Sequence, residues 1–431
     1  MHAGFDYGTS NCSIGVVRSR RVELLPLEDD ATQIPSTLYA PRRQVEAARP
    51  AADVRGIDLS AQPFSDLKFG AAALEAYLRQ PGEGYFVKSP KSYLGAQGLS
   101  TELRERFVAV VAAMMQNVRE RASAALDAHV DDVVIGRPIH FQGASGVEED
   151  ARALAMLTEA ARAAGFRRVE FQFEPMAAAM DYESRLTTEQ CILVLDIGGG
   201  TTDCSFVRVG PSRRDRVDRE ADVLGHGGER VGGNDYDQLL ALKRLMPPLG
   251  FGDELASGLP IPNTYFVDAV SINDVNAQQR FLSAKTTREL RRFVREAREP
   301  ARIARLLDVH RRRQTHRLVR SAEHAKIALS SAPCAHVDLS YLDEGLVVDA
   351  RREDLATSCE RLLAHLYGLV GEVVRAAGRS PDVVYLTGGM SGAAIVREFL
   401  WQRFPEANFV DGDHFAAVTA GLALWAERIY A

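Results

Sequence analysis

The sequence predicts an α/β fold of two lobes that are related by an internal duplication, with further segments inserted into each lobe. The main observation is a pair of matching turns, DYGTSNCS from Asp6 and DIGGGTTDCS from Asp196. Both contain D-x-G and T-[ST]-[ND]-C-S, and they differ by two extra glycines, Gly199 and Gly200. Segments of strand and helix periodicity also alternate along the chain, which indicates parallel strands joined by helices. A length of 431 residues leaves room for two or three domains.

The composition is that of an ordinary globular protein, with 46% hydrophobic and 26% charged residues. A net charge of −6 argues against a nucleic-acid surface spread over the whole chain. The five cysteines are an odd number without a C-x-x-C pair, which favours free thiols in a reducing compartment over disulfides or a metal cage. The N-terminus lacks a leader sequence, and the longest apolar run, 107–115, is too short to cross a membrane. We therefore expect a cytoplasmic protein that has no membrane partner.

The first lobe is expected to open on a meander of three strands, because apolar residues recur over 3–7, 13–17 and 22–27 with turn residues between them. Apolar residues at helical spacing then predict a helix over 101–129, and a strand over 132–138 and a helix over 147–164 follow. A strand over 169–173 leads through Glu174 and Pro175 into a helix of small residues.

The second lobe repeats this opening. A continuous apolar run over 191–196 is typical of a buried central strand, and strands over 205–209 and 217–225 are expected after it. The stretch 234–331 is mostly helical, with a loop rich in proline and glycine at 247–262, and indicates an inserted lid. The expected elements after it are strands over 335–341 and 345–350, a long helix, a strand that begins at Val383 and two closing helices.

These elements predict the domain organisation. We expect a first lobe over 1–188 with an inserted subdomain at about 36–127. A second lobe over 189–412 contains a helical lid at about 236–329. The remaining segment, 413–431, is expected to be a closing helix that packs back on the first lobe.

Each matching turn has the composition of a phosphate site. Backbone N–H groups of glycine and threonine in such a hairpin turn form a concave nest for phosphate oxygens, and threonine hydroxyls can bond a terminal phosphate. An aspartate just before the turn can hold Mg²⁺ through water. Because each turn follows the first strand of its own lobe, the pair predicts that the two lobes grip one polyphosphate. A third glycine turn, LTGGMSG from Leu386, ends a strand and opens a helix, and no Walker sequence is present.

These residues resemble the actin-like ATPases and, among them, the nucleotide-binding domain of the heat-shock protein 70 chaperones. The resemblance covers nearly the whole chain except about 41–65 and 243–319. Within the family, the chain resembles truncated bacterial homologues of DnaK of the YegD type. It implies a two-lobed actin-like ATPase whose lobes are both built on a ribonuclease-H-like sheet. The matching segments are GFDYGTSNCSIGVV, KSYLG, VVIGRP, FEPMAAAMDY, LVLDIGGGTTDCS, VGGNDYD, AEHAKIALSS and VVYLTGGMSG.

The resemblance implies ligands for ATP or ADP and for Mg²⁺. The ligands implied for Mg²⁺ are Asp6 and Asp196, which would hold the ion through bridging water molecules. Those implied for the phosphates are Gly8, Thr9, Ser10 and Asn11 in the first lobe and Gly199, Gly200 and Thr201 in the second. Those implied for adenosine are Gly232, Gly233, Glu323, Lys326, Ser330, Gly388 and Gly389.

The resemblance also implies three catalytic residues. Glu174 and Thr201 would position the attacking water, and Lys91 would be the catalytic lysine that stabilises charge on the phosphate. Lys88, three residues earlier, is an alternative to Lys91. In the alternative interpretation of Glu174, its carboxylate only stabilises the N-terminus of a helix.

The chain departs from the family in two places. The family clamps adenine between two arginines, whereas this sequence has Ile327 and Gly392 at those positions, so we expect weaker or less selective binding of adenine. The sequence also stops at Ala431 without the family's linker and peptide-binding domain. We therefore expect nucleotide binding to be retained and client-peptide binding of the usual kind to be missing.

Three functions fit these features. The first is a slow ATPase that acts as a chaperone-like nucleotide switch, with an unknown protein partner such as a co-chaperone or an exchange factor. The second is a nucleotide-dependent interaction module with little or no hydrolysis. The third, a small-molecule kinase of the same superfamily, lacks a sequence signal for its second substrate. The arginine-rich stretch 285–320 fits a solvated helix face better than a nucleic-acid site, because no aromatic residues accompany the charge.

Overall fold

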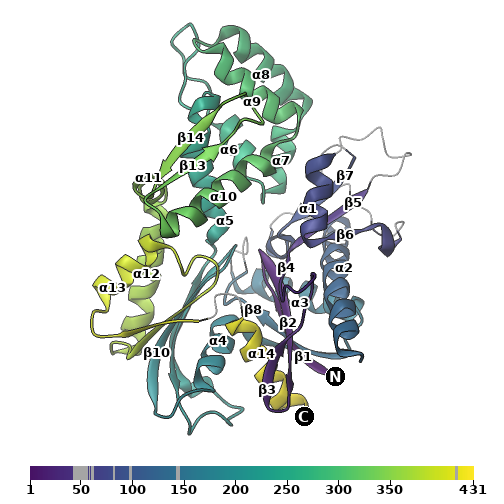
Figure 1. The fold of residues 1–431 in the computed structure, drawn as a ribbon, viewed down its shortest axis with the longest axis vertical. Coiled ribbons are helices and arrows are strands. Elements are labelled where there is room, and N and C mark those ends of the chain that lie inside the picture. The colour runs from purple at the N-terminus through teal and green to yellow at the C-terminus, as the bar shows by residue number, and fades with distance from the viewer. Residues whose placement is uncertain are drawn as a thin grey trace.

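The computed structural model describes residues 1–41, 57, 59, 63–80, 83–96, 100–141, 146–412 and 416–431. Within these residues two large sheets form the centres of two lobes (Figure 1). The first sheet has the order β3-β2-β1-β8-β9, with β4 paired to β2. Its strands are β1 (His2–Tyr7), β2 (Asn11–Arg18), β3 (Arg21–Leu24), β4 (Ile34–Pro35), β8 (Asp132–Arg137) and β9 (Arg168–Phe173).

The second sheet repeats this topology, with the order β12-β11-β10-β15-β16. In both sheets the hairpin strands pair antiparallel, the central strand pairs parallel with the next strand, and that strand pairs parallel with the edge strand. This repetition confirms the predicted duplicated α/β fold. The strands of the second sheet are β10 (Gln190–Ile197), β11 (Thr202–Val209), β12 (Val223–Glu229), β15 (Val383–Thr387) and β16 (Asn408–Asp411).

The two extra glycines change the register of the second hairpin. Cys12 lies opposite Tyr7 in the first hairpin, whereas the equivalent Cys204 lies opposite Leu195, two residues further from the turn. Each turn still spans four residues, 8–11 and 198–201, so Thr202 and Asp203, the counterparts of Ser10 and Asn11, join the strand pairing in the second hairpin.

Helices cover the two sheets and join the lobes. The C-terminal helix α14 (Ala417–Tyr430) packs against β1, β2 and α4 (Glu174–Glu183), so the end of the chain lies beside its beginning (Figure 1). The hydroxyl groups of Ser13 and Thr419 are 2.5 Å apart across this contact. The other covering helices are α2 (Thr101–Leu126), α3 (Val147–Ala163), α12 (Glu360–Ala377) and α13 (Ala394–Arg403).

Each lobe also carries a smaller sheet with helices. In the first lobe these elements are α1 (Gly70–Arg79) and the sheet of β5 (Thr37–Pro41), β6 (Lys68–Phe69) and β7 (Gly84–Lys88). In the second lobe they are α5 (Gly233–Leu240), α6 (Thr264–Val270), α7 (Val275–Phe281), α8 (Ala284–Glu296), α9 (Pro300–Arg311), α10 (Thr315–Ser331), α11 (Arg352–Ser358) and the hairpin of β13 (Cys334–Asp338) and β14 (Val347–Arg351).

The two inserted parts meet across the cleft between the lobes. The ring of His316 on α10 lies edge-on to the rings of Tyr77 and Phe86, at centroid distances of 5.2 and 5.1 Å. The hydroxyl of Tyr77 donates to the carbonyl of Arg313 at 2.9 Å. These contacts hold the upper ends of the lobes together and so define the width of the cleft below them.

Several boundaries differ from the sequence-based expectation. The strand expected over 217–225 begins at Val223, because Arg219 is buried in ion pairs with Glu183 (2.8 Å) and Asp222 (2.7 Å) that fix a turn before the strand. The helix expected to reach 129 ends at Leu126, because Asp127 adopts a left-handed conformation with φ 50°. Strand β16 was not predicted, and the expected closing segment includes 413–415, which lie outside the described residues.

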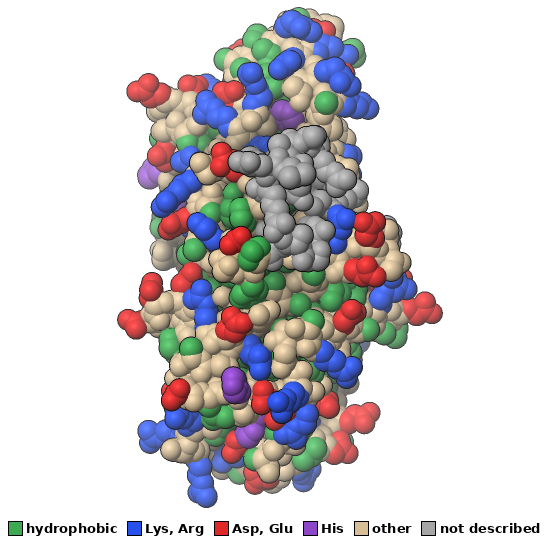
Figure 2. Space-filling view, turned by 90° about the vertical axis from the view of Figure 1, so that its right-hand side faces the viewer, with side chains coloured by type: hydrophobic (Ala, Val, Ile, Leu, Met, Phe, Trp, Pro, Cys, Tyr) green, Lys and Arg blue, Asp and Glu red, His purple; other side chains and the backbone are tan. Residues whose placement is uncertain are grey.

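The arginine-rich stretch lies at one end of the molecule. Lys and Arg side chains gather over this end in Figure 2, where α8 and α9 form the surface. Acidic neighbours pair with part of this charge: Arg298 lies 2.6 Å from Glu254, and Arg305 lies 2.8 Å from Asp343. All five cysteines are free thiols, as predicted, and none of the helices in the described part of the chain has the length and apolar character of a membrane span.

Candidate functional site

The two matching turns face each other across one cavity. Residues of the first turn, between β1 and β2, and of the second, between β10 and β11, line a cavity of about 460 Å³. The turns also touch, since a Cβ built at Gly199 would lie 3.0 Å from the Cβ of Ser10. The predicted phosphate residues in the lining are Gly8, Thr9, Ser10, Asn11, Gly199 and Thr201.

A buried ion pair lies in the wall of the same cavity. Lys91 belongs to a short 3₁₀ turn, Pro90–Tyr93, that follows β7, and Glu174 is the first residue of α4. The Nζ atom of Lys91 donates to Oε1 of Glu174 at 2.7 Å. Burial lowers the pKa of Lys91, but the charges of Glu174 and Asp6 outweigh it and raise that pKa overall. Lys91 therefore remains a cation in the cavity.

Three further carboxylates surround this ion pair. Burial raises the pKa of Asp6 to about 7, and the charge of Glu174 adds to the rise against the effect of Lys91. Burial and Glu174 likewise raise the pKa of Asp203 to about 8, although its carboxylate accepts a hydrogen bond from the Ile139 amide at 2.7 Å. The pKa of Asp196 is also raised well above its usual value by burial and by the neighbouring carboxylates. The cluster has an excess of negative charge that Lys91 does not neutralise.

This cluster fits a hydrated divalent cation. Mg²⁺ binds carboxylate oxygens and keeps several of its water molecules, so it can be held by Asp6 and Asp196 without direct contact to every acidic group. A cation there would also offset the repulsion that raises the pKa values of these carboxyl groups. The residues predicted to hold Mg²⁺ are therefore suited to it in number, kind and position.

The acidic cluster makes the stability of the cation-free protein depend on pH. Folding raises the pKa values of Asp6 and Asp203 above the usual ~3.9, so their stabilising contribution is complete below that pH and is lost as the pH rises through about 7 and about 8. We expect the protein in chelator to melt at a lower temperature at about pH 8.5 than at about pH 6. The variant Asp203→Asn should show a smaller decrease, and thermal melts at both pH values test this. Equal pH dependence of the two proteins would contradict the assignment.

The predicted adenosine residues come together only in part. Those in the lining of the same cavity are Gly233, Glu323, Lys326, Gly388 and Gly389. The Nζ atom of Lys326 lies 2.8 Å from Asp237 and 3.1 Å from the carbonyl of Gly233, while Glu323 pairs with Lys88 from the opposite lobe at 3.4 Å. Lys88 thus lies beside the predicted adenosine residue Glu323, and it is Lys91 that lies beside Asp6 and Glu174.

Three predicted residues lie outside the described lining of this cavity. Gly232 and Gly200 pack against each other, and a Cβ at Gly232 would lie 2.6 Å from the amide nitrogen of Gly200. Gly232 therefore packs against the back of the second turn, to which Gly200 belongs.

Ser330 is exposed on α10 and lines a second hollow, of about 430 Å³, together with Arg352, Arg397 and Trp401. Gly392 lines both hollows, so the second hollow adjoins the cavity where the base is expected.

The glycine turn after β15 closes the floor beside Asp196. Gly388 has a φ of +82°, a left-handed conformation that favours glycine, and a Cβ there would lie 2.5 Å from Oδ1 of Asp196. The amide of Met390 donates to the carbonyl of Ile197 at 3.2 Å, which ties this turn to the second phosphate turn. The glycine turn after β15 and the second phosphate turn are thereby held in fixed positions on either side of Asp196.

Sequence reasoning missed some residues of the site. Asp203 was not among the predicted residues, although the internal repeat places it at the position of Asn11, a predicted phosphate ligand. Asn234 and Thr387 line the cavity itself, directly beside predicted residues in the sequence. The internal duplication could therefore have predicted Asp203. The position of Asn234 and Thr387 next to predicted motif residues could have predicted those two.

The fold and the site together define a class of protein. Two duplicated α/β lobes whose glycine-rich turns face each other over a buried acidic cluster are the architecture of the actin-like ATPases. A family model described as Hsp70 protein matches residues 2–243, more than half of the chain. The chain belongs to the Hsp70 family, which confirms the resemblance inferred from its motifs.

Relatives with established names agree with this family. The chaperone protein HscA of Yersinia enterocolitica is 30% identical over 248 residues, which are 56% of this chain and 37% of that protein. The chaperone protein HscA of Salmonella agona is 32% identical over 248 residues, which are again 56% of this chain and 37% of that protein. The match thus covers little more than a third of the length of these chaperones. The Hsp70 family to which they belong is a family of chaperone-type ATPases.

Proposed function

We propose that the chain binds ATP and Mg²⁺, hydrolyses the nucleotide slowly and uses the reaction as a chaperone-like switch in the cytoplasm. The carrying observation is that both matching turns, the Lys91–Glu174 ion pair and the paired aspartates Asp6 and Asp196 line a single cavity between the lobes. Its phosphate-binding backbone, buried cation and acidic floor suit a polyphosphate with a divalent metal. The name of the matched relatives, chaperone protein HscA, supports the chaperone part of the proposal. The partner that we propose is a co-chaperone or an exchange factor.

The proposed reaction is attack of water on the γ-phosphorus of ATP, with cleavage of the bond to the β-phosphate and release of ADP and phosphate. Bound Mg²⁺ would supply charge neutralisation on the phosphates. The Lys91 ammonium stabilises the charge that develops on the transferred group, because it is fixed and buried before substrate arrives. Glu174 accepts a hydrogen bond from Lys91 and has a second carboxylate oxygen with which, together with Thr201, it orients the water.

Phosphate release by the purified protein separates this proposal from its alternative. We expect slow release that requires both ATP and Mg²⁺ and stops in chelator. If nucleotide binds and changes the protein but no phosphate appears, the nucleotide-dependent interaction module is the correct function. If neither binding nor release occurs, both functions are wrong.

The missing arginine clamp leads to a prediction about the base. Ile327 is 59% exposed beside the cavity, and a Cβ added at Gly392 would meet nothing within 4 Å. Each lost cation–π contact is worth ~0.5–2 kcal/mol, so ATP and GTP should bind with affinities within about tenfold of each other. The variant Ile327→Arg should favour ATP relative to the parent protein, as measured by competitive titration.

Strong ATP selectivity in the parent protein would contradict this prediction. It would mean that another side chain replaces the clamp, and Arg352 and Arg397 of the adjoining hollow are the nearest candidates. Alanine variants at these two positions would then identify which of them contacts the base.

A further inference from the structure

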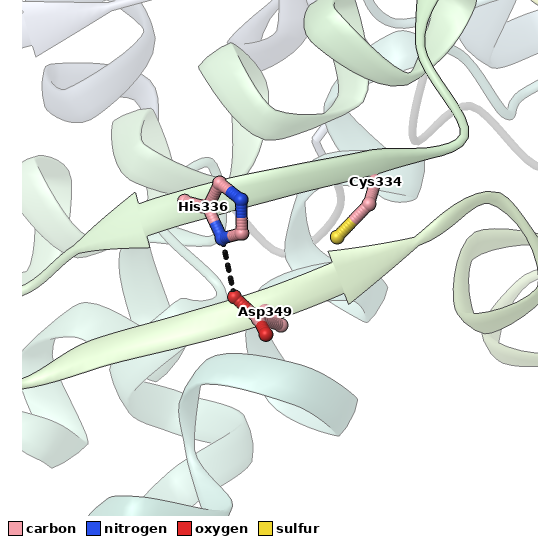
Figure 3. A group of neighbouring side chains, drawn as sticks. All are labelled: Cys334, His336 and Asp349. Atoms are coloured by element: carbon pink, nitrogen blue, oxygen red, sulfur yellow. Dashed lines mark hydrogen bonds and ion pairs between the residues drawn. The ribbon is translucent and has the colours of Figure 1, made fainter.

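A cluster of three metal-ligand side chains lies on the small hairpin of the second lobe, away from the nucleotide cavity. Cys334 and His336 come from β13, and Asp349 comes from β14 (Figure 3). One potential ligand atom from each residue lies within 4.8 Å of the others. Neither the nucleotide site nor the family relationship assigns a role to this group.

The hairpin geometry places all three side chains on one face. His336 lies directly opposite Asp349 in the antiparallel register, and Cys334 is two residues before His336, where strand side chains return to the same face. The Nδ1 atom of His336 lies 2.6 Å from Oδ1 of Asp349. In Figure 3 the sulfur of Cys334 points into the space beside this pair.

The scaffold under the cluster is rigid, and the cluster itself is open to solvent. The alternate residues of the two strands, Ala335, Val337, Val348 and Ala350, are buried in the core of the second lobe. The side chains of His336 and Asp349 are 75% and 58% exposed. An ion can therefore reach the ligands without any rearrangement of the fold.

We propose that Cys334, His336 and Asp349 form a binding site for one Zn²⁺ ion or a chemically similar divalent cation. Tetrahedral zinc with bonds of about 2.0–2.3 Å holds its ligand atoms roughly 3.3–3.6 Å apart, so rotations of side chains within the observed cluster suffice to form the site. A thiolate, an imidazole and a carboxylate suit zinc, whereas Mg²⁺ prefers oxygen ligands alone. The site is thus chemically distinct from the acidic cluster of the cleft.

The fourth coordination position of the ion would be open. Three protein ligands at an exposed place leave room for water or for a side chain of another molecule, which is the pattern of reactive or bridging zinc and not of closed structural zinc. The inference rests on the hairpin alone and is independent of the proposed ATPase.

Cobalt titration of the 431-residue chain tests the site. The protein is freed of metal, kept reduced with a phosphine and saturated with Mg²⁺ so that the cleft carboxylates are occupied, and Co²⁺ is the probe. We expect one Co²⁺ per chain with a thiolate-to-cobalt absorption band that Zn²⁺ abolishes. The band should be absent in Cys334→Ser, and His336→Ala and Asp349→Asn should each raise the dissociation constant at least about tenfold.

The matched control is His365→Ala, because His365 is also an exposed histidine but lies on α12. It should bind Co²⁺ as the parent protein does. The proposal is wrong if no band forms, if His336→Ala and Asp349→Asn bind as tightly as the parent, or if one ion bridges two chains.

A measurement on the unmodified sequence guards against variants that fail to fold. Cys334 is partly exposed, whereas the other four cysteines are buried, so its alkylation can be followed by peptide mass spectrometry. Zn²⁺ should slow the alkylation of Cys334 at least about tenfold. An unchanged alkylation rate at saturating Zn²⁺ would overturn the proposal.

Discussion

Replacing Lys91 by alanine should lower the rate of phosphate release from saturating Mg-ATP by about 10²-fold or more, the usual effect of removing one preorganised group that stabilises transition-state charge. Lys91 is the cation in direct contact with Glu174, at 2.7 Å in the cavity wall. Nucleotide affinity should change far less, because in the proposed function the backbone of the two turns provides most of the contacts to the phosphates. Single-turnover phosphate release and a separate binding titration distinguish the two effects. Glu174→Ala should have a similar effect on the rate.

The folding of the Lys91 variant needs its own control. Removing Lys91 leaves the Glu174 carboxylate buried beside Asp6 and Asp203, and breaking a buried ion pair in this way costs about 3–5 kcal/mol. The double variant Lys91→Ala/Glu174→Gln removes the uncompensated charge and should recover most of the lost stability. It should still release phosphate slowly. Recovery of the parent rate in this double variant would show that the ion pair is structural.

Lys88→Ala is the matched control for the position of the catalytic lysine. Lys88 pairs with Glu323, a predicted adenosine residue, across the cleft at 3.4 Å. Its loss should weaken nucleotide binding a little and leave the rate at saturating ATP close to that of the parent. If Lys88→Ala alone stops phosphate release, the assignment of Lys91 is wrong.

Replacing Asp196 by asparagine should have two effects of opposite sign. Burial and neighbouring carboxylates raise the pKa of Asp196, so its charge is unfavourable in the cation-free protein, and the variant should melt at a higher temperature in chelator near neutral pH. The same variant should lose most of the stabilisation that Mg²⁺ adds in the presence of ATP. For the parent protein, total stabilisation by ligand is about 2.7 kcal/mol at a hundredfold excess over Kd.

Thermal melts in chelator and in Mg²⁺, each with and without ATP, measure both effects of Asp196→Asn. A general folding defect would lower every melting temperature, which separates it from loss of a ligand for the cation. If the variant responds to Mg-ATP as the parent does, Asp196 has no part in holding the metal.

The fold could be predicted largely because the duplication repeats in the sequence itself. The matching turns at Asp6 and Asp196 fixed the expectation of two equivalent sheets, and both sheets have the same strand order. Strand β16 was missed because its four residues, Asn408–Asp411, are half polar and too short to give a clear period. The start of β12 was misplaced because the ion pairs of Arg219 with Glu183 and Asp222 are tertiary contacts that local periodicity does not report.

The site residues that belong to a sequence motif could be predicted. The contacts between segments that are far apart in the sequence could not. Lys91 and Glu174 are 83 positions apart, and their contact depends on how the inserted sheet packs above the first lobe. The excess negative charge of the cluster became visible only with Asp203, which lies on β11 beside the same cavity wall. The cross-strand cluster of Cys334, His336 and Asp349 has no sequence signature, because the pairing of two strands creates it.

The melting temperature of the unmodified protein in Mg-ATP is the most direct test of the central claim that the two lobes hold one Mg-nucleotide between their matching turns. The account predicts that the melting temperature rises with nucleotide concentration and that omission of Mg²⁺ removes most of this rise. A flat melting temperature across millimolar Mg-ATP and Mg-ADP would contradict it.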